Sequence, residues 1–390
     1  MFADPQAYLL VLLVSVALYW IIPSSLPKLR AFVLIIISAV FLFTVSPLAL
    51  LALGVITLTA IITLRLTLQK GSARIAWLGV LAIVVEFFIF QYYNARSANI
   101  VVTFLVVYGM SYVAFRSIAA MLDWKLYKRR PERAPSALDF TLLNTFFPIV
   151  PSGPIEKLDR LRVSALGRKA EPGLIGYGVL RLFVGLFMVG FVGDRIILAN
   201  LTPMQEIYYG EGAGVSILGT WWFCILSLLY LYANFSGFMS IAIGSGALFN
   251  LKISENFNWP FMSTNIQDFW KRWHVTLGEF ANRYMYFPML KVFKGNPYIS
   301  IFITFVLVGV WHAINMQFLL WGVFHGIALA LYAFLSRKIF SPDMGAGSVR
   351  LVRAFGWLAT MLFVCWAWTF AASPTIEGSW RMTGRLFGLG

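Results

Sequence analysis

The 390-residue chain is too apolar for a water-soluble protein. Apolar residues make up 60% of it and charged residues only 12%. A soluble domain has roughly 45–50% apolar residues and about 25% charged residues. The net charge is +15. This composition excludes a cytosolic enzyme, a secreted disulfide scaffold, a nucleic-acid-binding protein and a disordered linker, and it leaves a polytopic membrane protein.

The hydropathy pattern predicts about ten transmembrane helices, because such helices need roughly 17–25 mostly apolar residues. The first run lacks a preceding basic stretch, so it is not typical of a cleaved signal, and Lys28 and Arg30 follow it. This charge order places residue 1 outside and the first loop in the cytoplasm. The predicted spans are 7–23, 31–46, 47–65, 75–93, 99–121, 174–200, 214–236, 298–313, 316–336 and 352–372.

The excess of Lys and Arg falls in the loops that this orientation places in the cytoplasm. Those loops are 24–30, 66–74, 122–173, 237–297 and 337–351. Retention of Lys and Arg on the cytoplasmic side explains the charge by topology alone. The same charge also produces a positive field that attracts acidic lipid headgroups or an acidic protein.

Two of the cytoplasmic segments do not have the pattern of simple loops. Residues 138–156 are apolar but are interrupted by three prolines and Gly153, and residues 252–297 mix aromatic and charged side chains. Segments too broken to span usually lie in the interface or re-enter the bilayer beside a cavity. These re-entrant or interfacial segments are therefore where we expect a functional site.

Three histidines are the first candidates for chemistry, since imidazole transfers protons readily at neutral pH. His312 ends the predicted span 298–313, where an ionisable group is costly and suggests function. A buried structural histidine is the equal alternative. His325 lies thirteen residues further on, about 220° around a straight helix. We expect a structural role for it, although a break near Asn315 would change that geometry.

His274 lies in the sequence NIQDFWKRWHVTLGEF. Helical spacing predicts an amphipathic aromatic helix here, at the cytoplasmic interface. Such a helix is either a membrane-surface anchor or one wall of a reaction chamber.

Three further ionisable residues fall within predicted spans, namely Glu86, Arg116 and Arg181. Each should face protein or a wet cavity, and helix-to-helix hydrogen bonds or ion pairs explain them as well as catalysis does. No metal site is expected, because three scattered histidines and two cysteines in apolar stretches do not have metal-ligand spacing.

Several blocks occur in the order typical of one known family. GMSYVAFR, FFPIVPSGPIEKLDRLR, ENFNWPFMSTNIQDFWKRWHVTLGEF and GVWHAINMQFLLWGVFHG together resemble the membrane-bound O-acyltransferase (MBOAT) family. The similarity is greatest to its DltB-like D-alanyl-transfer branch and more distant to its AlgI-like alginate O-acetylation branch. The resemblance implies an all-α membrane protein with helices in a ring around a central tunnel. We expect one membrane domain over 1–390, with N-terminal helices to 121, a core over 122–336 and a C-terminal helix and tail from 337.

The resemblance also assigns roles to residues. The essential histidine of the family falls on His312, which becomes the expected general base, and the second family histidine falls on His274, expected to hold the donor or stabilise an oxyanion. Substrate contacts are expected at Trp311, Asn315, Trp270, Trp273, Arg272 and Ser152.

The implied activity moves a small acyl group, D-alanyl or acetyl, across the bacterial cytoplasmic membrane. The donor would be a cytoplasmic thioester, either phosphopantetheine on an acidic acyl carrier protein or acetyl-CoA, with no permanently bound cofactor. The acceptor would be a hydroxyl of an extracytoplasmic envelope glycopolymer such as teichoic acid, reached directly or through an extracytoplasmic or small membrane partner. A transporter or lipid flippase, and an inactive scaffold, are the alternatives.

The chain departs from the family pattern at four positions. Acidic residues of the family are replaced at Asn234 and Ser240, and Asn282 and Arg283 stand where the family has Arg-Asp. These changes remove negative charge near the expected site. They leave the identity of donor and acceptor open.

Overall fold

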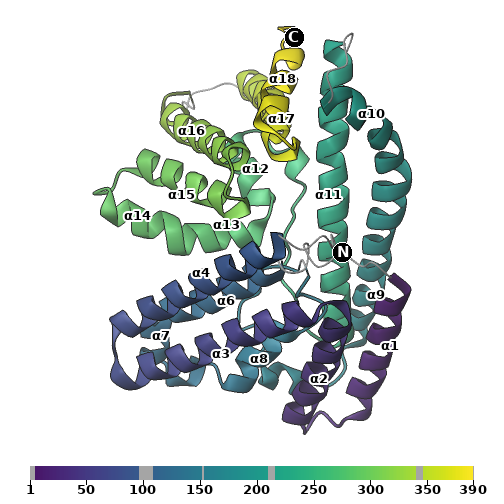
Figure 1. Cartoon of the computed structure of the whole chain (residues 1–390), viewed down its shortest axis with the longest axis vertical. Coiled ribbons are helices and arrows are strands. Elements are labelled where there is room, and N and C mark those ends of the chain that lie inside the picture. Colours follow the sequence, from purple (N-terminus) through teal and green to yellow (C-terminus); the bar gives the residue numbers. More distant parts are fainter. Residues whose placement is uncertain (1–4, 96–108, 152, 210–215, 340–345, 390) are drawn as a thin grey trace. The chain divides into compact units, whose positions relative to one another are not determined.

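The described part of the chain is helical, in agreement with the predicted all-α class. A computed structural model describes residues 5–95, 109–151, 153–209, 216–339 and 346–389 (Figure 1). Within these ranges the β-type pairing is limited to an isolated bridge between Phe257 and Trp273.

The chain forms two compact units. Unit 1 contains residues 1–186 and 237–255, and unit 2 contains residues 187–236 and 256–390. The chain therefore passes from one unit to the other within helices as well as at residue 255. One membrane domain with sections ending at 121 and 336 stays a prediction.

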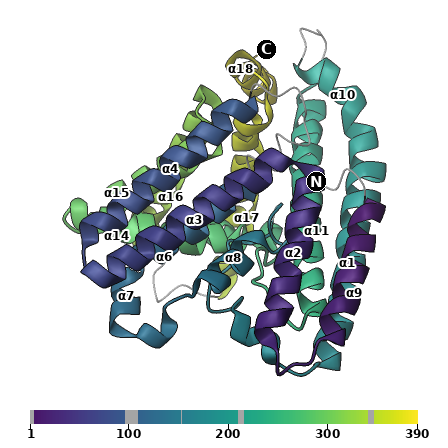
Figure 2. The same ribbon diagram turned by 60° about the horizontal axis from the view of Figure 1, so that its bottom comes forward.

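Unit 1 begins with long apolar helices. Proline at the first turn starts α2 and α3, and Gly71, with φ 63°, ends α3, as expected for a residue that adopts the left-handed conformation without a Cβ clash. Helices α3, α4 and α6 lie side by side (Figures 1 and 2). The helices of this unit are α1 (Pro5–Ile21), α2 (Pro27–Val45), α3 (Pro47–Lys70), α4 (Ala73–Ala95), α6 (Met110–Leu122), α7 (Trp124–Arg129), α8 (Ala137–Thr145) and α9 (Pro172–Leu186).

The proline-interrupted segment of unit 1 is not a spanning helix, which confirms the prediction for residues 138–156. The nine-residue α8 ends at Thr145, and the chain is then irregular up to the short 3-10 helix η3 (Val163–Gly167). Buried Arg116 of α6 donates hydrogen bonds to the carbonyl oxygens of Leu143, Ile149 and Pro154, at 3.1, 3.2 and 2.8 Å. One guanidinium group thus provides hydrogen bonds to backbone carbonyl groups that would be bonded within a helix if the segment were helical.

The other ionisable residues of the predicted spans also have partners in unit 1. The hydroxyl of Thr59 donates to Glu86 at 2.6 Å, and Arg181 forms an ion pair with Glu255 at 2.9 Å. These contacts favour the structural reading of both residues.

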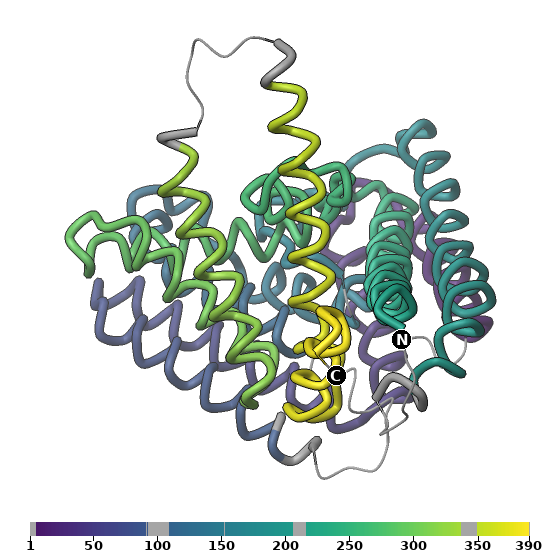
Figure 3. Tube along the Cα trace, turned by 90° about the horizontal axis from the view of Figure 1, so that it is seen from above, coloured from purple at the N-terminus to yellow at the C-terminus, as the bar shows by residue number. Residues whose placement is uncertain are grey.

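Unit 2 holds shorter helices as well as long ones. Helices α15 and α16 lie side by side (Figures 1 and 3) and are joined by residues 313–315. Their backbones approach closely at Gly309 and Gly322, where an added Cβ would collide with carbonyl oxygens of the facing helix. The elements are η4 (Phe187–Leu198), α10 (Ala199–Tyr209), α11 (Ile217–Leu248, shared with unit 1), η5 (Pro260–Met262), α12 (Ile266–Arg272), α13 (Val275–Ala281), η6 (Asn282–Tyr286), α14 (Phe287–Val292), α15 (Pro297–His312), α16 (Met316–Ile339), α17 (Ala346–Ala372) and α18 (Ile376–Leu386).

Helix lengths agree with the predicted spans at most positions. Within the described ranges, seven helical stretches are long and apolar enough to cross a membrane, and α1, α6 and α15 are shorter apolar helices. The predicted span 99–121 begins among residues outside those ranges. The predicted end of one span at residue 236 is wrong, because α11 continues to Leu248. Residues 237–248, GFMSIAIGSGAL, contain no proline and no charged residue, and the helix continues through their three glycines.

Candidate active site

The segment around His274 is not the continuous amphipathic helix that its spacing predicts. Helix α12 ends at Arg272, and His274 has a left-handed backbone with φ 49° before α13 begins at Val275. The break is held by an extended segment beside it. The backbone N–H of Asn258 donates to the carbonyl of Arg272 at 2.9 Å, and that of Val275 donates to the carbonyl of Asn256 at 3.0 Å.

Asn256 also holds the imidazole of His274. Its Oδ1 lies 3.1 Å from His274 Nδ1 and accepts hydrogen bonds from the backbone N–H and the hydroxyl of Thr276, both at 3.0 Å. The edge of the imidazole meets the ring of Phe235 at 5.0 Å between centroids. His274 is therefore fixed on two sides, and only 4% of it is exposed.

The environment keeps His274 neutral at physiological pH. In the sequence, His274 lies between α11 and α15 and outside the spanning helices. Burial first, and then the nearby imidazole of His312, lower the pKa of His274 to about 3. A neutral imidazole has one lone pair, so it can accept a proton or a hydrogen bond from a substrate.

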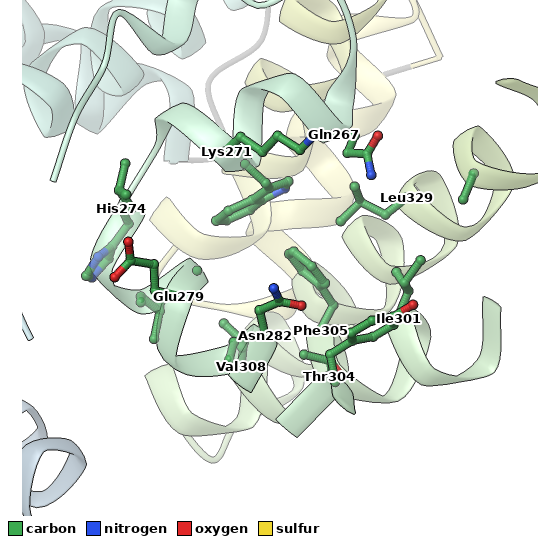
Figure 4. A pocket seen from close by; sticks show the side chains of 17 residues that line it. Gln267, Lys271, His274, Glu279, Asn282, Ile301, Thr304, Phe305, Val308 and Leu329 are labelled. Atoms are coloured by element: carbon green, nitrogen blue, oxygen red, sulfur yellow. The ribbon is translucent and has the colours of Figure 1, made fainter. Parts of the chain in front are cut away.

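A pocket of about 430 Å³ opens beside His274. Figure 4 shows His274 and Glu279 at one end of it, Lys271 and Gln267 along one edge, and Asn282 between them and the apolar side. The apolar side is formed by α15 and α16 and includes Ile301, Phe305, Val308 and Leu329. An apolar cavity with a few convergent polar groups is typical of a small-molecule site.

His312 lies one helical turn beyond this pocket. It is the last residue of α15, four residues after the lining residue Val308 and so on the same face of the helix. Its half-buried ring stacks on Phe318 and meets the ring of Trp321, each at 5.4 Å between centroids. The pocket end and the end of α15 thus bring two imidazoles within electrostatic reach of each other.

The family follows from a comparison with family models. The model of the MBOAT, membrane-bound O-acyltransferase family, matches residues 34–372. The chain belongs to the MBOAT family. His274 and His312 both lie within the matched range.

Known relatives of this MBOAT chain have moderate identity. It is 29% identical over 254 residues to a peptidoglycan O-acetyltransferase of Helicobacter pylori, covering 65% of this chain and 47% of the relative. It is 27% identical over 292 residues to a probable alginate O-acetylase AlgI of Pseudomonas aeruginosa, covering 73% and 52%. It is also 27% identical over 244 residues to a teichoic acid D-alanyltransferase of Bacillus subtilis, covering 59% of each. The chain spans about half the length of the first two, and equal identities do not separate the AlgI-like branch from the D-alanyl-transfer branch.

The third histidine of this MBOAT chain is part of an aromatic cluster. His325 is 2% exposed, and its Nδ1 accepts a hydrogen bond from Trp270 Nε1 at 3.2 Å. Trp321 lies 4.6 Å from His325 between ring centroids and also meets His312. The chain breaks between α15 and α16, so His312 and His325 both contact the ring of Trp321. This is the break near Asn315 that would change the geometry of a straight helix.

The expected substrate-binding residues have different surroundings. Trp270 lines the pocket, and its bond to His325 holds the indole in place. Trp273 is 8% exposed and stacks on Phe269 at 5.6 Å, within the aromatic core of unit 2. Arg272 forms an ion pair with Asp268 at 2.9 Å.

The remaining expected residues lie at the α15–α16 turn or outside the description. Trp311 lies next to His312, with 4.4 Å between ring centroids. Asn315 is exposed, and its Oδ1 accepts the backbone N–H of Phe318 at 2.9 Å, which caps α16. Ser152 lies outside the described residues.

Some residues of the site were not singled out by the sequence. Asn256, Lys271 and Glu279 lie in the quoted family blocks, but no spacing rule distinguishes them from their neighbours. Asn282, noted as a departure from the family, lines the pocket, so the loss of a charge there changes the pocket itself. Asn234 donates to the carbonyl of Tyr230 within α11.

The other two departures lie in different surroundings. The guanidinium of Arg283 lies over the ring of Tyr284 at 5.3 Å, and Ser240 is buried in unit 1.

Proposed function

We propose that this MBOAT protein is a membrane O-acyltransferase that moves a small acyl group from a cytoplasmic thioester to a hydroxyl of an extracytoplasmic envelope polymer. The observation that carries the proposal is the pair of family-motif histidines. His274 lies at the end of a pocket, and His312 lies on α15 one turn beyond the pocket-lining residue Val308.

The chemistry needs little beyond positioning and one base. A thioester carbonyl is already activated, so the acceptor hydroxyl attacks it when its proton is removed. His312 takes that proton, the C–O bond forms, the C–S bond breaks, and the proton passes to the leaving thiolate. A positioned general base contributes roughly 10²–10⁴-fold, and holding donor and acceptor together adds an orientation effect.

The donor and its carrier are assigned by chemistry and charge. A D-alanyl or acetyl group would arrive on phosphopantetheine of an acidic carrier protein, or as acetyl-CoA. The exposed basic residues from Lys125 to Arg133 would attract either one electrostatically. The relatives are named for peptidoglycan, alginate and teichoic acid, which suggests an envelope polymer as acceptor, reached directly or through a partner protein.

The proposed location is the bacterial cytoplasmic membrane with residue 1 outside. In this orientation the segment with His274 is cytoplasmic, and α15 leads from it towards the outer face. Its 16 residues would span only about 24 Å. The His274 pocket reaches to within one turn of His312 at the end of this short helix, which would bring a cytoplasmic donor close to an outer acceptor.

Mass spectrometry of the envelope polymers tests the proposal. It compares wild type, a deletion strain, and the deletion complemented with His312→Ala or with Ile314→Ala, all at matched membrane levels. Ile314 is 71% exposed and two residues from His312, so it is a matched control. We expect the ester to be lost with His312→Ala and kept with Ile314→Ala, and its mass identifies the acyl group. An ester that persists in the His312→Ala strain contradicts the proposal and favours transport or a scaffold role.

A further inference from the structure

The amide orientation of Asn256 is determined by its neighbours. Its Oδ1 accepts the backbone N–H of Thr276 at 3.0 Å. A backbone N–H is always a donor, so the atom that faces it must be the amide oxygen and not the amide nitrogen. The hydroxyl of Thr276 donates to the same oxygen at 3.0 Å.

This orientation determines which nitrogen of His274 carries the proton. The same Oδ1 lies 3.1 Å from His274 Nδ1. An amide oxygen can only accept hydrogen bonds, so Nδ1 must donate. A neutral imidazole carries one ring proton, which leaves the lone pair on Nε2. Nε2 is itself buried, and His274 is one of the residues that line the pocket.

Asn256 also constrains the backbone on which the ring is carried. Its carbonyl accepts the N–H of Val275 at 3.0 Å, which lies directly after the left-handed residue His274. One residue therefore controls the position of the ring through the backbone and its proton through the side chain.

We infer that Asn256 is a positioning residue for the acyl transfer. It holds His274 as the Nδ1–H tautomer and so makes Nε2 the nitrogen that accepts a hydrogen bond or a proton. In this form Nε2 does not donate to an oxyanion, so of the two roles expected from the sequence the tautomer favours holding the donor over stabilising an oxyanion. The role in catalysis rests on the proposed function, whereas the tautomer does not.

The tautomer is measured directly by NMR of protein labelled with ¹⁵N-histidine in detergent micelles. The chain has three histidines, and the signal missing from a His274→Asn variant assigns His274. We expect wild type to carry the proton on Nδ1 and Asn256→Ala to lose this preference. Thr276→Val is the matched control, because it keeps the backbone N–H that orients Asn256. A proton on Nε2 of wild-type His274 overturns the inference, whatever the activity.

Kinetics of acyl transfer separate positioning from general damage. We expect Asn256→Ala to lower kcat about 10–100-fold, the size of effect seen when the hydrogen-bond partner of a metal-ligating histidine is removed. Asn256→Asp keeps an acceptor oxygen and should restore most of kcat. Its added negative charge stabilises the imidazolium, so the acid limb of the pH profile should move to higher pH. Lys271, Glu279, Tyr286 and His312 are the other titratable groups at the site, and they are common to all variants.

The outcomes distinguish the two proposals. Wild-type kcat in Asn256→Ala, or an Asn256→Asp variant with the same loss and an unmoved pH profile, would overturn the positioning role. Loss of transfer in His312→Ala together with full transfer in His274→Asn would leave the proposed function standing and remove His274 from it. Each variant is first checked for an unchanged elution profile in detergent.

Discussion

At the residue scale, His274 combines an uncommon backbone conformation with burial. A left-handed backbone costs roughly 1–2 kcal/mol for most side chains, and asparagine is among the residues that tolerate it best. His274→Asn therefore removes the imidazole with the least disturbance of the break between α12 and α13. This makes asparagine a better test substitution at this position than alanine or a β-branched residue.

The burial of His274 predicts a loss of stability in acid. The pKa of His274 is about 3 in the folded protein and about 6.5 in an unfolded chain. Between these values the unfolded chain binds a proton that the folded protein does not. Stability from this residue is therefore complete above about pH 6.5 and falls by about 1.4 kcal/mol per pH unit as the pH drops towards 3.

Melting temperatures in detergent between pH 7.5 and pH 5 measure this effect. We expect wild type to lose more stability over this range than His274→Asn, which has no titrating group at the position. Parallel pH dependence of the two proteins would show that folding does not lower the pKa of His274.

At the scale of elements, the close approach of α15 and α16 should determine the position of His312. A Cβ at Gly309 would collide with the carbonyl oxygen of Phe318 and lie 3.0 Å from Gly322 Cα. We expect Gly309→Ala to push the helices apart at a cost of about 1–3 kcal/mol. The His312 ring, three residues away, would move with α15, and such a displacement lowers activity by up to about 100-fold.

Gly54→Ala is the matched control, because a Cβ there meets no atom within 4 Å. It should keep full activity and slightly raise the melting temperature, since alanine is the better helix former. Equal effects of the two substitutions on acyl transfer would contradict a role for the α15–α16 contact.

A second element-scale prediction concerns the irregular segment after α8. Arg116→Met leaves three backbone carbonyls of residues 143–154 without their donor. We expect a loss of about 3 kcal/mol or more in stability, seen as a lower melting temperature and faster proteolysis within 146–156. The control is Arg129→Met on α7, whose side chain is exposed. Unchanged proteolysis in Arg116→Met would show that the segment is held by other contacts.

The sequence predicted the elements better than it predicted their interruptions. Long apolar runs identify spans because hydropathy is a local property, and α2, α3 and α16 were found in this way. The break at His274 was missed because it depends on pairing with residues 256–258, which lie about fifteen residues earlier in the chain. The helix end at Leu248 was missed because the distribution of Lys and Arg predicts on which side of the membrane a loop lies. It does not predict the residue at which the loop begins.

The same distinction applies to the site. The family blocks pointed to His274, His312 and Trp270, and these lie in or next to one pocket region of unit 2. Asn315, by contrast, caps a helix, and Trp273 packs in an aromatic core. A sequence motif does not distinguish a residue that lines a site from one that supports it, because both kinds of residue occur next to each other in the same motif.

At the scale of the whole molecule, the charge distribution predicts the orientation. Exposed Ile314 should lie outside and exposed Glu132 in the cytoplasm. In intact cells we expect a membrane-impermeant thiol reagent to label Ile314→Cys, and to label Glu132→Cys only after the membrane is opened. The native Cys224 and Cys365 are buried and free, so they give little background. Labelling of Glu132→Cys in intact cells would reverse the proposed orientation.

The α15–α16 hairpin also bears on how the nascent chain enters the bilayer. Helix α15 has 16 residues with a histidine at its end, whereas α16 has 24, and a span normally needs about 20. Helix α15 is apolar but short, and a short span followed within three residues by a long one is expected to leave the translocon as a pair. His312 would then reach its final depth only after α16 has been synthesised. Assembly of the reaction site would thus be a late event of biogenesis, and a chain truncated before α16 would leave α15 uninserted.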